Sequence, residues 1–209
     1  MKTYVIVGAR NFGREVICWT MDLINRGHDA RIAGVIDDDP HSLAGYDYDL
    51  KWLGTLGDYQ PIEDHELLLA VADPRFKEKT AMLLESKGGR FASLIHPTAV
   101  IASSVRLSRG VIFCPYSVAS ADARVDEFVT VNCHSGIGHN AHVGAFSTLS
   151  SYVDLTGHAS LGKRVLVGSG ARLLPRVSVG DDAIVGAGST VVRNVPNGVT
   201  VYSPPARRL

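Results

Sequence analysis

The chain has 209 residues, 45% of them apolar, and its 21 basic and 21 acidic residues leave no net charge. This balance gives no electrostatic footprint for nucleic acid or for an anionic membrane surface, so we expect neither as a partner. No apolar run is long enough to span a membrane and the first residues lack a signal-peptide pattern, so we expect a soluble, cytoplasmic protein without membrane insertion. The cysteines are odd in number and scattered, which fits a reducing compartment. They are Cys18, Cys114 and Cys133.

The first 94 residues predict a small Rossmann-like domain. Their apolar and glycine pattern indicates a strand, a glycine turn, a helix and a second strand that ends in three aspartates, followed by a third strand and a second helix. Asp73 and Pro74 supply an N-cap and a first-turn proline for that second helix. The expected ranges are residues 3–7, 32–36 and 67–72 for the strands, a first helix that ends near residue 27, and residues 74–87 for the second helix.

Two features of this domain lie where parallel sheets bind ligands, beyond the carboxyl ends of the strands. One is the glycine turn of residues 8–13, and the other is the acidic pair Asp37 and Asp38. The turn lacks the dinucleotide fingerprint because Arg10 stands where its middle glycine belongs, so we do not expect a pyrophosphate to approach the backbone there. Each feature also has a plain structural interpretation, as a tight strand-to-helix connection and as a solvated loop.

Residues 95–196 divide into seventeen blocks of six residues without insertion or deletion. The first position of every block is apolar, and the fifth is always Ala, Ser or Val. Neither a helix nor a flat strand repeats every six residues, whereas a parallel β-helix does, with three blocks per coil. We therefore predict a column of between five and six coils, followed by a tail at residues 197–209. Glycines at the second position, such as Gly138 and Gly144, are expected to serve tight turns.

The six-residue repeat resembles that of the hexapeptide acyltransferases, whose columns are left-handed parallel β-helices. The whole layout, a Rossmann-like domain at residues 1–94 and a column at residues 95–196, resembles the sugar O- and N-acyltransferases of the NeuD and PglD type. This resemblance implies an acetyl-CoA-dependent acetyltransferase. Its expected acceptor is an amino or hydroxyl group of a sugar, above all a nucleotide-linked amino sugar. It also implies a homotrimer with active sites between columns, and no metal.

The resemblance also places site residues by position. It puts His139 at the general base, on the local pattern Val131-Asn132, Ile137-x-His139 and Val143-Gly144. Histidine suits this task because it titrates near neutral pH. Asn140 stands where the best-known members have an acid. The acceptor is expected at Ala9, Arg10, Asn11, Phe12, Asp37 and Asp38, and acetyl-CoA at Thr148, Ser169 and Ala187.

Three further histidines lie on the predicted column, and a histidine counts as catalytic only with a geometric partner. We therefore expect them to be polar side chains on the outside of the coils. They are His134, His142 and His158.

Two other functions stay open. Some hexapeptide columns are zinc hydratases, and His134 and His139 are five residues apart. A catalytic zinc needs three protein ligands, and the register of that family puts the third at Thr98, whereas His96 is out of register by two residues. The other alternative is a non-catalytic ligand-binding relative. It stays open because of three departures from the expected pattern, namely Arg10, Asn140 and Thr148.

Overall fold

The computed structural model describes residues 1–204, so the last part of the predicted tail, residues 205–209, lies outside the described residues. The chain separates into two compact units, Met1–Pro97 and Thr98–Leu209. The predicted fold class, a Rossmann-like domain followed by a left-handed parallel β-helix, is confirmed.

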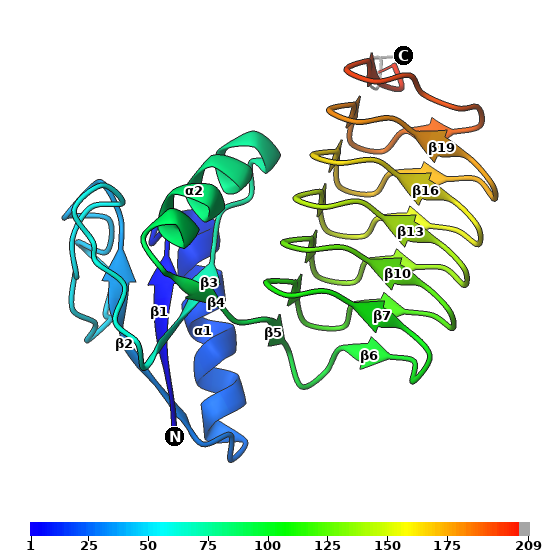
Figure 1. Cartoon of the computed structure of the whole chain (residues 1–209). Helices are drawn as coiled ribbons and strands as arrows, with labels where there is room; N and C mark the ends of the chain where they lie inside the picture. Colours follow the sequence, from blue (N-terminus) through cyan, green and yellow to red (C-terminus); the bar gives the residue numbers. More distant parts are fainter. Residues whose placement is uncertain (205–209) are drawn as a thin grey trace. The chain divides into compact units, whose positions relative to one another are not determined.

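The first unit is a four-stranded parallel sheet with the strand order β2-β1-β3-β4 (Figure 1). Its central strand β1 is buried at every position except the first, which explains the apolar run that predicts it. The elements are β1 (Lys2–Val7), α1 (Asn11–Asn25), β2 (Ala30–Ile36), β3 (His65–Leu69), α2 (Pro74–Ser86) and β4 (Arg90–Phe91), after which comes β5 (Leu94–Ile95).

Two glycines make the connection from β1 to α1 possible. Gly8 has a φ of +90°, which side chains rarely allow, and a Cβ on Gly13 would lie 2.1 Å from the Gly8 carbonyl oxygen. The chain can therefore turn directly from the strand into the helix. At α2 the predicted N-cap is confirmed, because the Asp73 carboxylate accepts a 2.7 Å hydrogen bond from the Phe76 amide.

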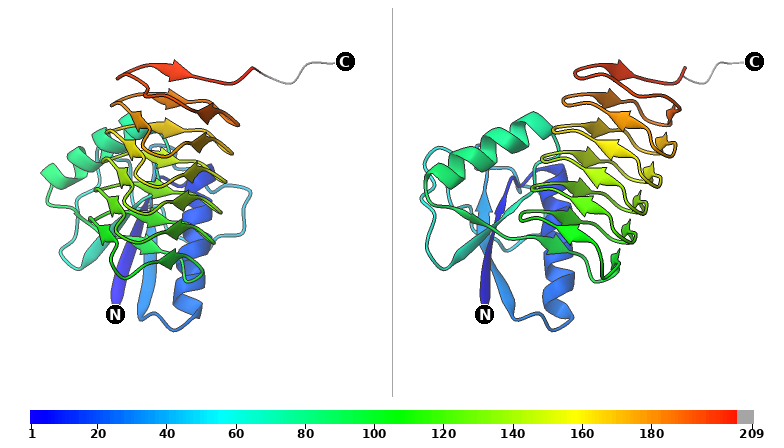
Figure 2. Two further views of the ribbon diagram at one scale, coloured as in Figure 1. Left: turned by 90° about the vertical axis from the view of Figure 1, so that its right-hand side faces the viewer. Right: turned by 45° about the vertical axis from the view of Figure 1, so that its right-hand side comes forward.

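The second unit is a column of 18-residue coils, with each strand hydrogen-bonded to the strand one coil further on (Figures 1 and 2). Thr130, for example, pairs with Thr148. The first wall consists of β6 (Val100–Ile101), β9 (Val118–Ala119), β12 (Gly136–Ile137), β15 (Asp154–Leu155), β18 (Arg172–Leu173) and β21 (Thr190–Val191). The second has β7 (Arg106–Leu107), β10 (Arg124–Val125), β13 (His142–Val143), β16 (Ser160–Leu161) and β19 (Ser178–Val179). The third includes β8 (Ile112–Phe113), β11 (Thr130–Val131), β14 (Thr148–Leu149), β17 (Leu166–Val167), β20 (Ile184–Val185) and β22 (Thr200–Val201).

The core of the column follows the repeat. First-position residues such as Val125 and Val143 are fully buried, and so are fifth-position residues such as Ala123 and Ala159. The apolar first-position side chains fill the interior of the column, while the small fifth-position side chains fit beside them where the wall bends. The sequence pattern and the buried core therefore describe the same set of side chains.

The corners depend on the fourth position of each block. Every sixth residue from Gly110 to Gly188 has a positive φ, between 56° and 71°, and most of these residues are not glycine. The expectation that second-position glycines make the turns is wrong. Gly144 has no positive φ, and a Cβ there would lie 2.5 Å from the Gly162 carbonyl carbon of the next coil. These glycines allow the coils to stack closely.

None of the helices within residues 1–204 is long and apolar enough to cross a membrane.

Stacking predicts different outcomes for two glycines of the column. Gly144→Ala forces a methyl group against the next coil and should destabilise the column by about 1–3 kcal/mol, as overpacking does. Gly136→Ala is the matched control, because a Cβ at that position meets no atom within 4 Å. Chemical unfolding followed by circular dichroism would measure both, and equal stabilities of the two variants would contradict the stacking explanation.

Candidate functional site

The first unit contains a cavity of ≈ 260 Å³ beyond the carboxyl ends of its strands. Three residues predicted to bind the acceptor line it together, namely Arg10, Asp37 and Asp38. The other lining residues are largely apolar, so the cavity suits a flat, partly apolar group with a few polar atoms. They are Gly8, Ile36, Leu56, Val71 and Phe76.

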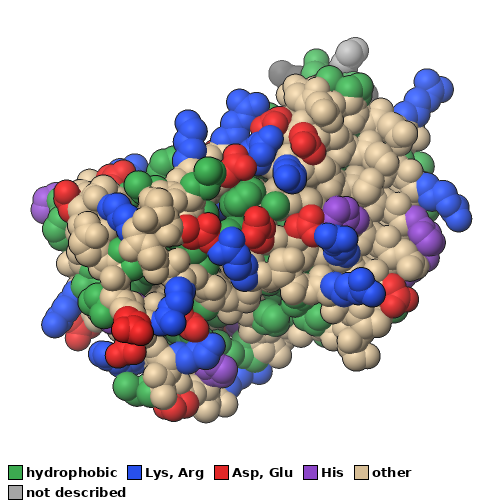
Figure 3. All heavy atoms as spheres, viewed as in Figure 1, with side chains coloured by type: hydrophobic (Ala, Val, Ile, Leu, Met, Phe, Trp, Pro, Cys, Tyr) green, Lys and Arg blue, Asp and Glu red, His purple; other side chains and the backbone are tan. Residues whose placement is uncertain are grey.

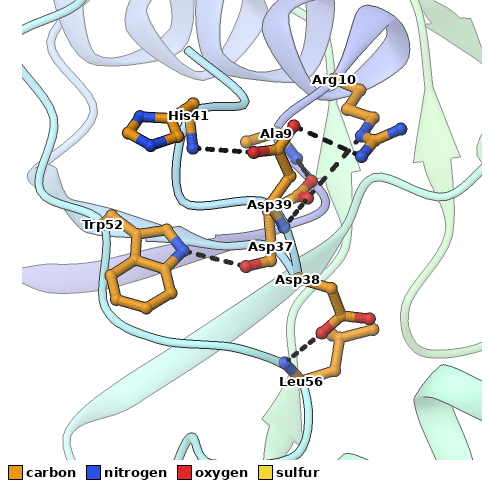
Figure 4. A network of polar contacts seen from close by, with 8 residues as sticks. All are labelled: Ala9, Arg10, Asp37, Asp38, Asp39, His41, Trp52 and Leu56. Carbon is orange, nitrogen blue, oxygen red and sulfur yellow. Dashed lines mark hydrogen bonds and ion pairs between the residues drawn. The ribbon is translucent and has the colours of Figure 1, made fainter. Parts of the chain in front are cut away.

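Asp37 holds the glycine turn in place (Figure 4). Asp37 is only 7% exposed. Its carboxylate accepts hydrogen bonds from the amides of Ala9, at 2.8 Å, and Asp39, at 2.9 Å. The Ala9 amide is thus already bound to a carboxylate. A ligand phosphate cannot use it, which adds a physical reason to the missing fingerprint of this turn.

Asp38 points away from Ala9 and Arg10, toward Leu56 (Figure 4). Its Oδ1 accepts a 2.9 Å hydrogen bond from the Leu56 amide, while its Oδ2 has no partner in the described part of the chain. The side chain is exposed, so Oδ2 can accept a hydrogen bond from a ligand. Arg10 brings positive charge to the same place, with its guanidinium 3.8 Å from Asp37 and 3.4 Å from Asp39.

The other residues predicted for the acceptor do not line this cavity. The Asn11 side chain accepts a hydrogen bond from Arg14 at 3.1 Å, and Phe12 packs edge-on against Trp19. Sequence reasoning missed Leu56, Val71 and Phe76. Of these only Phe76 left a signal, as an aromatic residue three positions after the N-cap of α2.

On the column, His139 is oriented by its neighbour in the chain. Its Nδ1 lies 3.0 Å from Oδ1 of Asn140, which can only accept a hydrogen bond. Nδ1 therefore carries the proton, and the lone pair is left on Nε2. Gly157 leaves room for this edge of the ring, since a Cβ there would lie 2.5 Å from Nε2. The exposed ring of His139 is thus arranged to take a proton through Nε2.

The other three histidines of the column have different surroundings. His142 lies 2.9 Å from the carboxylate of Asp126, and His158 packs edge-on against His139 with ring centroids 5.1 Å apart. His134 is stacked between Tyr116 and Tyr152 on the neighbouring coils, with centroid distances of 5.1 and 4.9 Å. Each therefore has a packing or ion-pairing explanation without catalysis.

The residues predicted for acetyl-CoA fall into two groups. Thr148 is buried in β14. Ser169 and Ala187 are exposed at the same corner of successive coils, and each is followed by a glycine with positive φ and open space around it, Gly170 and Gly188. Across residues 1–204, the amides of Ser169 and Ala187 have no hydrogen-bond partner. This corner therefore carries two unpaired backbone amides, each beside a glycine with open space around it.

Basic and acidic side chains are interspersed over the face seen in Figure 3, where no large patch of one sign forms. Among the described side chains, no group of three or more His, Cys, Asp or Glu is placed to hold a metal ion.

Comparisons with known proteins find a family match in the column. The family of the bacterial transferase hexapeptide (six repeats) matches residues 158–193. A search of curated protein sequences gives no significant match.

Solved structures match over nearly the whole chain. The acetyltransferase domain of PglB from Neisseria gonorrhoeae FA1090 in complex with acetyl coenzyme A is 26% identical with a TM-score of 0.85, covering 100% of this chain and 99% of that one. A mutant of perosamine N-acetyltransferase from Caulobacter crescentus in complex with CoA and GDP-perosamine is 28% identical with a TM-score of 0.85, covering 99% and 96%. WeeI from Acinetobacter baumannii AYE is 25% identical with a TM-score of 0.85, covering 100% of both chains.

The contacts of Asp37 predict a role in stability. Asp37→Ala leaves the buried Ala9 amide and the half-buried Asp39 amide without this partner and should destabilise the first unit by about 1–3 kcal/mol. Asp38→Ala, at an exposed side chain, should cost about 1 kcal/mol or less. Both tryptophans, Trp19 and Trp52, belong to the first unit, so tryptophan fluorescence during urea unfolding reports on that unit alone. Equal losses in the two variants would contradict the role assigned to Asp37.

Proposed function

We propose that this chain, whose resemblance to the hexapeptide-repeat sugar acyltransferases of the NeuD and PglD type is confirmed, is an acetyl-CoA-dependent sugar N-acetyltransferase. The observation that carries the proposal is the match, over 99% of the chain, to an N-acetyltransferase with bound CoA and a nucleotide-linked amino sugar. The geometry at His139 supports it, because acyl transfer to an amine needs a base with a free lone pair at an open position.

The reaction assigns one task to His139. The amino nitrogen of the sugar attacks the carbonyl carbon of the thioester, so that a C–N bond forms and the C–S bond breaks. Nε2 of His139 takes the proton that the nitrogen loses and then gives it to the departing thiolate of CoA, which returns the imidazole to its neutral form. Asn140 keeps the ring in the required tautomer through Nδ1. Because its amide is neutral, it orients the ring without the charge of a carboxylate.

We assign the acyl donor to the corner of Ser169 and Ala187. Their amides are one coil apart, about 4.8 Å. The pantetheine arm of CoA carries two amide carbonyls separated by a short linker, and an extended chain can place them against two donors on successive coils. Gly170 and Gly188 leave this corner open enough for a chain to lie on the backbone. Thr148 remains a predicted contact of the donor.

We assign the nucleotide part of the acceptor to the cavity of the first unit. Its apolar lining suits a planar base, and Oδ2 of Asp38 can accept a hydrogen bond from a ring N–H. Asp37 contributes indirectly, by holding the turn that carries Arg10.

We also infer a homotrimer in the cytoplasm, with active sites between columns. The first wall of the column carries several exposed apolar side chains, which suit burial against a second copy of the chain. His139 follows β12 of this same wall, so the interface would bring a neighbouring column to the proposed base. The apolar residues are Val100, Val118, Leu174 and Val192, which are 61%, 39%, 41% and 61% exposed.

The general base is tested by His139→Ala. Its kcat with acetyl-CoA and nucleotide-linked amino sugars, measured by mass spectrometry of the product, should fall about 10²- to 10⁴-fold. His142→Ala is the control, because that ring is paired with Asp126 and should leave turnover near wild type. Near-normal turnover in His139→Ala would refute the base, and a wild-type protein that acetylates no sugar would support the non-catalytic alternative.

The donor site is tested by filling its open corner. Gly170→Asn keeps the fold, because Asn140 already adopts the same left-handed conformation elsewhere in the column. The new side chain should raise the KM for acetyl-CoA about tenfold or more, the effect of losing about 1.4 kcal/mol of binding. Gly198→Asn is the matched control, since Gly198 has a similar φ and equally open surroundings but lies above Asp181 at another corner. Equal effects of the two variants on acetyl-CoA would contradict this site.

A further inference from the structure

Lys87, at the C-cap of α2, donates hydrogen bonds to a loop about thirty residues earlier in the chain. Its ammonium nitrogen lies 3.2 Å from the Leu56 carbonyl oxygen and 3.2 Å from that of Tyr59, and it also contacts the Gly57 carbonyl. All three N–H donors of the ammonium group therefore have an acceptor. We refer to residues 55–59 as the Leu56 loop.

A cation at a helix C-terminus ordinarily compensates the carbonyls of its own helix. Lys87 instead reaches acceptors 28 to 31 residues away in the chain. Its side chain is half-buried along this path. Capping of α2 therefore does not account for this geometry, and the loop is what the lysine holds.

Two other contacts fix the same loop. The Leu56 amide donates to Oδ1 of Asp38 at 2.9 Å, and Tyr59 is only 5% exposed, with its hydroxyl 3.3 Å from Nδ1 of His65. Burial raises the pKa of the Tyr59 phenol, so this anchor stays neutral over the physiological range. Asp38 thus binds an amide of the Leu56 loop, and Lys87 binds its carbonyl groups.

The position of the loop determines the shape of the cavity. Leu56 and Asp38 both line it, and the hydrogen bond between them orients the Asp38 carboxylate. If the loop moved, the cavity would lose an apolar wall, and Oδ2 of Asp38 would lose its fixed direction. The donor corner of Ser169 and Ala187 belongs to the other unit and does not depend on these contacts.

We propose that Lys87 is a positioning residue for the acceptor: it fixes the Leu56 loop as a wall of the cavity and so sets the affinity for the nucleotide part of the acceptor sugar. This inference rests on the proposed function, since it concerns the acceptor of that same reaction. Lys87 does not touch the reacting atoms, and it acts only through the loop.

The test is Lys87→Met, which keeps a long unbranched side chain and removes the three donors. The KM for the nucleotide-linked amino sugar should rise about tenfold, as the loss of about one charged hydrogen bond would predict. The kcat and the KM for acetyl-CoA should stay near wild type. Lys79→Met is the matched control, because Lys79 lies on the same helix, is exposed and has no partner among residues 1–204.

Hydrogen exchange of the Leu56 amide gives a second measurement that does not need turnover. It should speed up in Lys87→Met and stay unchanged in Lys79→Met. Unchanged exchange, or faster exchange without any change in acceptor KM, would overturn the proposal. Equal rises in both KM values would also overturn it, because they would indicate a general loss of structure.

The same experiment separates this proposal from the proposed function. A wild-type protein that acetylates sugars while Lys87→Met behaves like wild type refutes only the role of Lys87. A wild-type protein that acetylates no nucleotide-linked sugar refutes the function and, with it, the acceptor role of Lys87, whereas the exchange data would still report whether the lysine holds the loop.

Discussion

The column depends on a backbone conformation that most residues avoid. Left-handed backbone costs a non-glycine residue about 1–2 kcal/mol, yet this conformation recurs at every sixth residue from Gly110 to Gly188. A single coil could not hold such corners. They persist because each coil is hydrogen-bonded to the next, in 18-residue register up to Val191 and in 16-residue register in the last coil, and because the first-position side chains form one continuous core. The left-handed corners therefore persist only while the coils stay stacked, so the column is expected to unfold cooperatively.

The candidate residues of the column and the cavity of the first unit are consequently positioned in different ways. Ser169, Ala187 and His139 occupy the same position of the repeat, and the coil spacing fixes their heights on the column. The cavity of the first unit lies among loops, and its geometry comes from side chains that bind backbone groups, as Asp37 and Lys87 do. The repeat positions the residues of the column, whereas individual hydrogen bonds position those of the cavity.

This difference decides what the sequence could predict. The repeat is visible in the six-residue spacing of apolar and small residues, so the coil length and the buried positions of the column were predictable. His139 and Asn140 are adjacent in the chain, so their contact does not depend on bringing distant segments together. The contacts of Leu56 with Asp38 and Lys87 join residues 18 and 31 positions apart in irregular segments, where no periodicity indicates them. The second-position glycines were misread because a close approach between coils and a sharp turn leave the same mark in a sequence.

The bond between Asp37 and the Ala9 amide limits how this domain can change its ligand. Rossmann-type turns are natural candidates for redesign toward dinucleotides, and the obvious first step here would replace Arg10 by the missing glycine. That step would open space without freeing a donor, since the amide that should meet the phosphate is held by a buried carboxylate. Removing the carboxylate would free the amide and loosen the turn at once. A change of specificity toward dinucleotides would therefore have to replace Arg10 and Asp37 together.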